Sequence, residues 1–220
     1  MKTDIQEKEA NAIINSIKII DPAVGSGRFL VSALNEIIAL KSQLGILADK
    51  NGRKIKDYII SVFNDELDIS DSEDGKPFDY KYKVAEKQRI QETLFNEKRQ
   101  IIENSLFGVD LNSNSVKIYR LRLWIELLRN AYYTQESEYR QLETLPNLEL
   151  NIKCGNSLIN RFDIDIDISE TIKNLDFTIE DYKLSVRNYK NSTLKSTKDD
   201  LISKIEKIKQ SFSAEIKKPS

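Results

Sequence analysis

The chain has 220 residues, of which 40% are apolar, and its 34 basic and 35 acidic side chains give a formal charge of -1. This apolar content is sufficient for a folded core, and the near-neutral charge does not favour a stand-alone clamp on duplex DNA held by phosphate contacts. The sequence contains no histidine. This excludes histidine acid–base catalysis, Ser–His nucleophilic pairs and histidine metal sites.

The cysteine usage and the N-terminal sequence bear on where the protein works. Cys154 is the single cysteine, so an internal disulfide framework is excluded, and we interpret it as a small buried apolar residue. The first residues are charged rather than typical of a signal peptide, and no apolar run approaches the length of a membrane span. We therefore expect a cytoplasmic protein with no membrane partner.

Apolar spacing and turn signals predict alternating helices and strands. Asn51-Gly52 is a strong hairpin signal, so we expect a small segment of antiparallel β-structure over residues 45–83. The expected helices cover residues 4–16, 29–44, 85–104 and 115–133, and the expected strands cover 17–20, 58–63, 78–82, 105–110 and 148–154. In the helix over 115–133, the apolar residues fall three or four apart: Ile118, Leu121, Trp124, Ile125, Leu128 and Tyr132.

The end of the chain differs in charge from the rest. Residues 163–181 hold seven acids and one lysine, whereas residues 183–218 hold ten basic and four acidic residues. Apolar residues at spacings of three and four predict a helical hairpin that turns near residues 191–196, with Thr178 and Thr197 as N-caps.

Polar side chains stand at three predicted strand ends. Asp21 follows the first strand and opens a turn that contains Gly25 and Gly27, Asp110 ends the strand over 105–110, and Asn156 follows the strand over 148–154. Glycines between a strand and a helix let a cofactor approach the backbone closely. The pattern therefore predicts one cofactor cleft.

Two kinds of phosphate-binding turn do not fit. Leu30 stands where a G-x-G-x-x-G motif needs its third glycine, and no P-loop sequence is present. S-adenosylmethionine fits better, because Asp21 can receive its ammonium group, Asp110 its ribose hydroxyls and Asn156 an adenine edge. A purely structural interpretation, in which the glycines only close a turn and the polar residues only cap helices, can explain each strand end singly. It does not explain why all three strand ends carry such residues.

These motifs resemble those of a known protein family. Residues 21–30, Asp-Pro-Ala-Val-Gly-Ser-Gly-Arg-Phe-Leu, resemble the D-P-A-x-G-S-G-x-F-L motif of amino-directed adenine DNA methyltransferases. Residues 108–112, 116–128 and 145–159 are similar to the blocks that follow in single-chain restriction-modification enzymes of type IIG. The resemblance covers residues 17–161.

The resemblance implies the fold and the roles of individual residues. The expected fold is α/β, a partial Rossmann-like sheet of an S-adenosylmethionine-dependent methyltransferase, with a β-hairpin insertion and a C-terminal helical hairpin. Residues 1–162 would form the cofactor-binding domain, with the insertion at about 45–104, and residues 163–220 an acidic linker and the hairpin. The implied contacts to the methionine part come from Asp21, Ala23, Gly25, Ser26 and Gly27, whereas Asp110 would hold the ribose and Asn156 the adenine.

The implied activity is methyl transfer from S-adenosylmethionine to the exocyclic amine of adenine in a specific DNA sequence. The family binds the flipped adenine with an [N/D/S]-P-P-[Y/F] motif, but the four prolines here, at 22, 77, 146 and 219, are never adjacent. We therefore expect a fragment with no catalytic residue of its own, which acts with other parts of the same polypeptide and reaches DNA through the full-length protein. A methyltransferase for RNA or protein and a non-catalytic scaffold or specificity module remain alternatives.

Other side chains receive structural interpretations. The acidic cluster from Asp65 to Asp74 is interpreted as a solvated loop rather than a metal site. The arginines at 120, 122 and 129 are interpreted as surface or ion-paired groups rather than DNA contacts. Phe29, Leu111 and Ile159 could wall the cofactor, but core packing is the favoured role of each.

Overall fold

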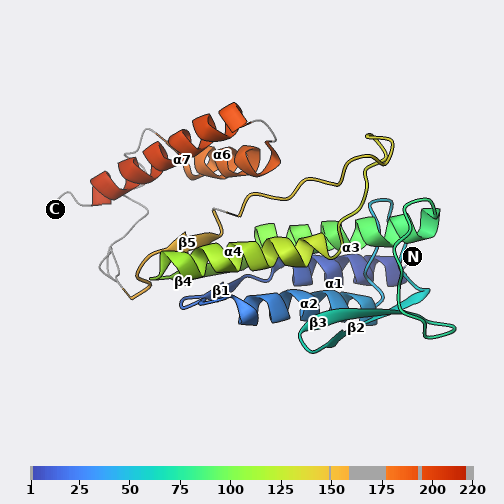
Figure 1. Ribbon diagram of the computed structural model, residues 1–220. Coiled ribbons are helices and arrows are strands. Elements are labelled where there is room, and N and C mark those ends of the chain that lie inside the picture. The colour runs from blue at the N-terminus through green and yellow to red at the C-terminus, as the bar shows by residue number, and fades with distance from the viewer. Residues whose placement is uncertain (1, 149, 159–176, 193–194, 217–220) are drawn as a thin grey trace. The chain divides into compact units, whose positions relative to one another are not determined.

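The computed structural model describes residues 2–148, 150–158, 177–192 and 195–216. The chain divides into two compact units, Met1–Ser157 and Leu158–Ser220, and each is described by itself. Figure 1 shows the elements of both units along the chain. The first unit contains, in order, α1 (Lys2–Ser16), β1 (Ile19–Asp21), α2 (Arg28–Gln43), β2 (Tyr58–Phe63), β3 (Glu66–Asp71), α3 (Ala85–Asn104), β4 (Leu106–Asp110), α4 (Ser113–Leu128) and β5 (Ile152–Cys154).

A three-stranded sheet organises the first unit. Its strand order is β1-β4-β5, and both pairings are parallel, with Ile19 opposite Leu106 and Gly108 opposite Ile152. Parallel neighbours require crossover connections, here α2 to α3 between β1 and β4, and α4 between β4 and β5. The prediction of an α/β fold with a parallel sheet is confirmed, and all three strands end at the same edge.

Three helices build the core over this sheet. α2, α3 and α4 contact one another, and α3 and α4 also contact β4. Buried residues recur at helical spacing on the first two of these helices: Leu30, Leu34 and Ile38 on α2, and Ile90, Leu94 and Ile101 on α3. Burial of these faces holds the strand ends in place, since each buried leucine or isoleucine contributes about 1.5–3 kcal/mol.

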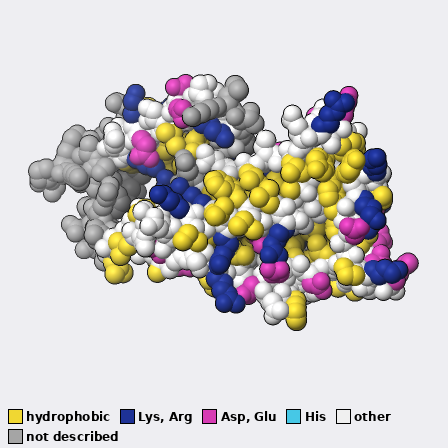
Figure 2. All heavy atoms as spheres, in the orientation of Figure 1, with side chains coloured by type: hydrophobic (Ala, Val, Ile, Leu, Met, Phe, Trp, Pro, Cys, Tyr) yellow, Lys and Arg dark blue, Asp and Glu magenta, His cyan; other side chains and the backbone are white. Residues whose placement is uncertain are grey.

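The inner face of α4 differs from the one that apolar spacing favoured. The buried residues of this helix include Val116, Tyr119, Leu123 and Leu127, whereas Ile118, Leu121, Ile125 and Leu128 are about half exposed. Figure 2 shows apolar side chains gathering on the visible face of the molecule. Because α4 is apolar on nearly all sides, periodicity alone could not identify its buried face.

The predicted antiparallel pairing within residues 45–83 is confirmed, but the second strand is not the one expected. β2 pairs with β3, so the expected strand over 78–82 is wrong, and four acids assigned to a solvated loop, Asp65, Glu66, Asp68 and Asp71, belong to this hairpin. Leu67 and Ile69 pack against the core while the acids alternate with them, which is the two-residue period of a half-buried strand. The connecting turn is Asn64-Asp65, with φ of 52° and 67°, as in tight hairpin turns.

The second unit contains α6 (Ile179–Asn191) and α7 (Lys195–Ile216), which pack together as the predicted helical hairpin. Tyr189, Ile205 and Ile208 are buried within it. Thr178 caps α6 as predicted, whereas Thr197 lies inside α7 and is not an N-cap. The N-terminal part of the acidic run, residues 163–176, lies outside the described residues.

Thr178→Ala should destabilise α6 by about 1 kcal/mol. The Thr178 hydroxyl accepts the Asp181 amide at 3.1 Å, and the Asp181 carboxylate accepts the Thr178 amide at 2.9 Å, so the substitution breaks a capping box. Amide hydrogen exchange in the first turn of α6 measures the loss. Thr197→Ala is the matched control and should not slow or speed exchange there; an equal effect of both variants would contradict the capping role.

Among the described residues, no helix is long and apolar enough to cross a membrane.

Candidate functional site

The three polar strand ends predicted from the sequence lie at one edge of the sheet. Asp21 is the last residue of β1 and lies opposite Gly108, while Asp110 ends β4 and lies opposite Cys154. Asn156 follows β5 by two residues and is exposed. Crossover connections bring these residues, which are far apart in the sequence, to the carboxyl edge of the sheet, where α/β proteins bind ligands.

A tight turn joins β1 to α2. The Asp21 carboxylate accepts the Ala23 amide at 3.0 Å through Oδ1, and among the described residues no donor reaches its Oδ2. Gly25 has a φ of 52°, and a Cβ there would find nothing closer than the Ala23 carbonyl at 3.9 Å. The backbone at Gly25 is therefore open to a ligand, and Asp21 retains an acceptor beside it.

Gly27 is required for a different reason. It has a φ of 76° and forms the N-cap of α2, and a Cβ there would lie 1.8 Å from Cδ2 of Tyr119. Glycine alone fits both this conformation and this contact.

Asp110 ties the turn to β4. Its Oδ2 accepts the Gly25 amide at 2.8 Å and its Oδ1 accepts the Asn112 amide at 2.8 Å. The Val24 amide also donates to the Val109 carbonyl at 2.9 Å. Each carboxylate oxygen has a second lone pair, so Asp110 can hold the turn and still accept a ligand hydroxyl. The sequence did not predict the hydrogen bond between Gly25 and Asp110, which lie 85 positions apart.

Tyr119 is a second residue that the sequence did not single out. It is fully buried on α4, and its ring contacts the space left by Gly27 and by Gly108, where a Cβ would lie 3.2 Å from Cε1 of the ring. Its hydroxyl is buried and has no hydrogen-bond partner among the residues that the structure describes. Burial, and then the negative charge of Asp21, raise the pKa of this hydroxyl. In the sequence, this tyrosine looks like any other apolar residue of α4.

Basic residues flank the turn, but most are already engaged. Arg28 pairs with Asp65 at 2.7 Å, and Arg129 with Glu66 at 2.5 Å. Arg120 donates to the Ile152 carbonyl at 2.6 Å, and Arg122 approaches the Ser26 hydroxyl at 3.4 Å. The interpretation as an ion-paired group is confirmed for Arg129. Arg120 differs, because it is half-buried and bonds to a backbone carbonyl instead of an acid. Ser26 is exposed beside Arg122.

Three residues near the edge are more exposed than expected. Phe29 is 61% exposed and Leu111 71% exposed, so the core-packing interpretation is wrong for both. Cys154 is also exposed, not buried, and its thiol contacts the Leu111 carbonyl at 3.5 Å. All three stand at or just beyond the ends of strands and helices, where the core no longer covers them. Phe29 and Leu111 leave apolar surface near the turn; Ile159 lies outside the described residues.

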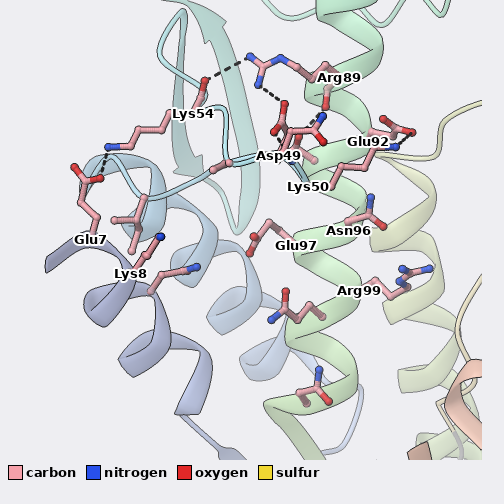
Figure 3. Close-up of a pocket in the computed structure, with 18 of the residues that line it drawn as sticks. Glu7, Lys8, Asp49, Lys50, Lys54, Arg89, Glu92, Asn96, Glu97 and Arg99 are labelled. Carbon is pink, nitrogen blue, oxygen red and sulfur yellow. Dashed lines mark hydrogen bonds and ion pairs between the residues drawn. The ribbon is translucent and has the colours of Figure 1, made fainter. Parts of the chain in front are cut away.

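The larger of the two described cavities lies elsewhere in the first unit. It has a volume of about 1120 Å³ and is lined by α1, residues 46–54 and α3. Figure 3 shows that several of its charged side chains point toward one another: Lys54 pairs with Glu7 at 2.5 Å, Arg89 with Asp49 at 3.2 Å and Lys50 with Glu92 at 3.9 Å. Because these groups satisfy each other, we place the candidate site at the strand ends instead.

The fold and this edge define an α/β protein with a glycine turn and two strand-end carboxylates beside it. Residues 3–212 match the family model of the MmeI DNA-methyltransferase domain, and the chain belongs to this family. Over 150 residues it is 33% identical to a predicted type II restriction enzyme and methyltransferase of Methanocaldococcus jannaschii. That alignment covers 68% of this chain but 9% of the relative. No solved structure matches the chain. The resemblance to the methyltransferase region of restriction-modification enzymes is thus confirmed.

Proposed function

We propose that this chain binds S-adenosylmethionine at the carboxyl edge of β1, β4 and β5, and that the polypeptide carrying it methylates the exocyclic amine of adenine in DNA. Membership of a DNA-methyltransferase family supports the reaction class. One observation carries the cofactor assignment. The backbone at Gly25 is open to a ligand, and its amide bonds to the carboxylate of Asp110, so the turn and the acid lie side by side.

The methionine part of the cofactor is assigned to Asp21 and the turn. The ammonium group would bond to Oδ2 of Asp21, since Oδ1 is occupied by the Ala23 amide, and a charge-assisted bond of this kind is about twice as strong as a neutral one. The aliphatic chain would lie along Ala23 and Ser26, which are exposed, and Gly25, which is half-buried. Gly27 is buried, so it would contribute by shaping the turn. When bound, the cofactor supplies the methyl group of its sulfonium.

The nucleoside part is assigned to the other two strand ends. Asp110 would accept the ribose hydroxyls with the lone pairs that the turn leaves available. Asn156 would bond to the adenine edge, and the exposed side chains of Phe29 and Leu111 would contact the ring faces. The residues present therefore fit the chemistry of this cofactor, with acceptors for its ammonium and hydroxyl groups and apolar side chains for its ring.

The choice of adenine rests on the motif over residues 21–30, which resembles that of amino-directed adenine methyltransferases. Binding a flipped adenine requires an aromatic ring and a hydrogen-bond acceptor for its amine. We assign these groups to other parts of a longer polypeptide, as the chain spans 9% of its relative's length. DNA and the rest of that polypeptide are accordingly the proposed partners.

Titration calorimetry with S-adenosylmethionine tests the cofactor assignment. Asp21→Asn should weaken binding at least tenfold, because Asn keeps the acceptor for the Ala23 amide but loses the charge that receives the ammonium. Asp79→Asn removes an equal charge from an exposed pair with Lys81 and should leave the affinity unchanged. Absence of binding heat, together with an unchanged melting temperature of the wild-type chain, would refute the assignment.

The base assignment needs the full-length protein. Transfer of a labelled methyl group to duplex DNA, followed by nucleoside analysis, should yield methylated adenine. Label in RNA, in protein or in cytosine would identify a different methyltransferase class.

A further inference from the structure

We propose that Tyr119 is a positioning residue of this cofactor site: its ring sets the position of the glycine turn against β4. This inference rests on the proposed function, since it assigns a residue to the same site. It concerns a side chain that is fully buried on α4.

The fit between the ring and two glycines is the first observation. Atoms Cδ2, Cε2 and Cγ lie 1.8, 2.3 and 2.5 Å from the place that a Cβ of Gly27 would occupy. On the other side, Cε1 lies 3.2 Å from that of Gly108. The ring thus occupies space that two glycines, one in the turn and one in β4, leave for it.

The second observation is that the turn is fixed from β4 as well. The Val24 and Gly25 amides donate to the Val109 carbonyl and the Asp110 carboxylate. Val24 and the Tyr119 ring both pack beside Gly108. A Cβ on Gly108 would lie 2.9 Å from Cγ2 of Val24. Hydrogen bonds to β4 and the ring of Tyr119 therefore hold the turn together, and loss of the ring removes the packed contact at Gly27.

The third observation assigns the positioning role to the ring of Tyr119 and not to its hydroxyl. The hydroxyl is buried and bonds to no other group in the described part of the chain, so no described hydrogen bond from it orients the turn. An unpartnered buried hydroxyl is costly rather than stabilising. Phenylalanine should therefore replace Tyr119 without loss of position, whereas a flexible aliphatic side chain should not.

Amide hydrogen exchange and calorimetry on the same variants test the inference. Tyr119→Leu should speed exchange of the Val24, Gly25 and Gly27 amides at least tenfold and weaken S-adenosylmethionine binding at least tenfold. Tyr119→Phe should match the wild type in both measurements. Leu127→Ala removes another fully buried side chain, two turns farther along α4, and should change stability without selective exchange at the turn.

Three results would overturn the inference: wild-type exchange at the turn in Tyr119→Leu, the same uniform increase in Tyr119→Leu and Leu127→Ala, or a tenfold loss of affinity in Tyr119→Phe. Should Tyr119→Leu fail to fold, Tyr119→Met serves as the variant without a ring. Failure of the proposed function is distinguishable, because the wild-type chain would then bind no cofactor while the exchange measurement still tests the ring.

Discussion

Gly27→Ala should lower the free energy of unfolding of the first unit by roughly 3 kcal/mol or more. Two costs add up. The residue has a φ of 76°, where an L side chain is strained, and its Cβ would meet the Tyr119 ring at 1.8 Å. The ring cannot withdraw easily, because it is fully buried and also contacts the space beside Gly108.

Gly45→Ala is the matched control for this substitution. Gly45 has a φ of 65°, but a Cβ there would meet nothing within 4 Å. Only the conformational strain applies, so the expected cost is about 1–2 kcal/mol. The difference between the two variants isolates the collision with Tyr119.

Urea unfolding followed by fluorescence measures both variants. Trp124 is the only tryptophan in the sequence; it lies in α4 and packs against the core of the first unit, so its emission reports on that unit. Tyr119→Leu should relieve part of the cost of Gly27→Ala, which gives a measurable coupling between the two sites. Equal losses in Gly27→Ala and Gly45→Ala would contradict the close contact.

Glu126→Met should cost the first unit about 3–5 kcal/mol, because it leaves a buried charge without its partner. Lys98 lies on α3 and Glu126 on α4, both are buried, and Nζ of Lys98 donates to Oε1 of Glu126 at 2.6 Å. After the substitution, the ammonium keeps the backbone carbonyl of residue 126, at 3.2 Å, as a hydrogen-bond acceptor.

Lys98→Met should cost less than Glu126→Met. In that variant the carboxylate retains Arg129, whose Nε lies 3.6 Å from Oε2 of Glu126. The double variant should be more stable than Glu126→Met alone, because two apolar side chains replace the pair without a stranded charge. Urea midpoints from Trp124 fluorescence decide the order, and equal losses in the two single variants would contradict the role of Arg129.

The pH dependence gives a second measurement of the same pair. Burial lowers the pKa of Lys98 from its ordinary value of 10.5, against the charge and the hydrogen bond of Glu126, which raise it. Between the lowered pKa and 10.5 the unfolded chain binds more protons, so stability should rise with pH in that window. In Glu126→Met the pKa falls further, and the rise should begin at a lower pH.

The sequence predicted most elements because their signals are local. Spacing predicts the helix over 85–104, the strand over 58–63 and the C-terminal helical hairpin, and the residue type of Thr178 predicts the cap. These features depend on neighbours within a few positions of each other. The expected strand over 78–82 failed for the opposite reason: β2 had two candidate partners, and the tight turn at Asn64-Asp65 joins it to the nearer one.

For the candidate site, the sequence by itself determined the chemical groups: an acid and a glycine turn after β1, an acid after β4 and an amide after β5. Their residue types are visible in the chain, and parallel strands bring such ends to one edge. The tertiary structure alone decided that Asp110 bonds to the turn 85 residues away and which face of α4 is buried. It also decided that Tyr119 fills the space left by Gly27 and Gly108. These contacts join residues distant in sequence, and their fit depends on side-chain volumes in a packed core, which no local pattern encodes.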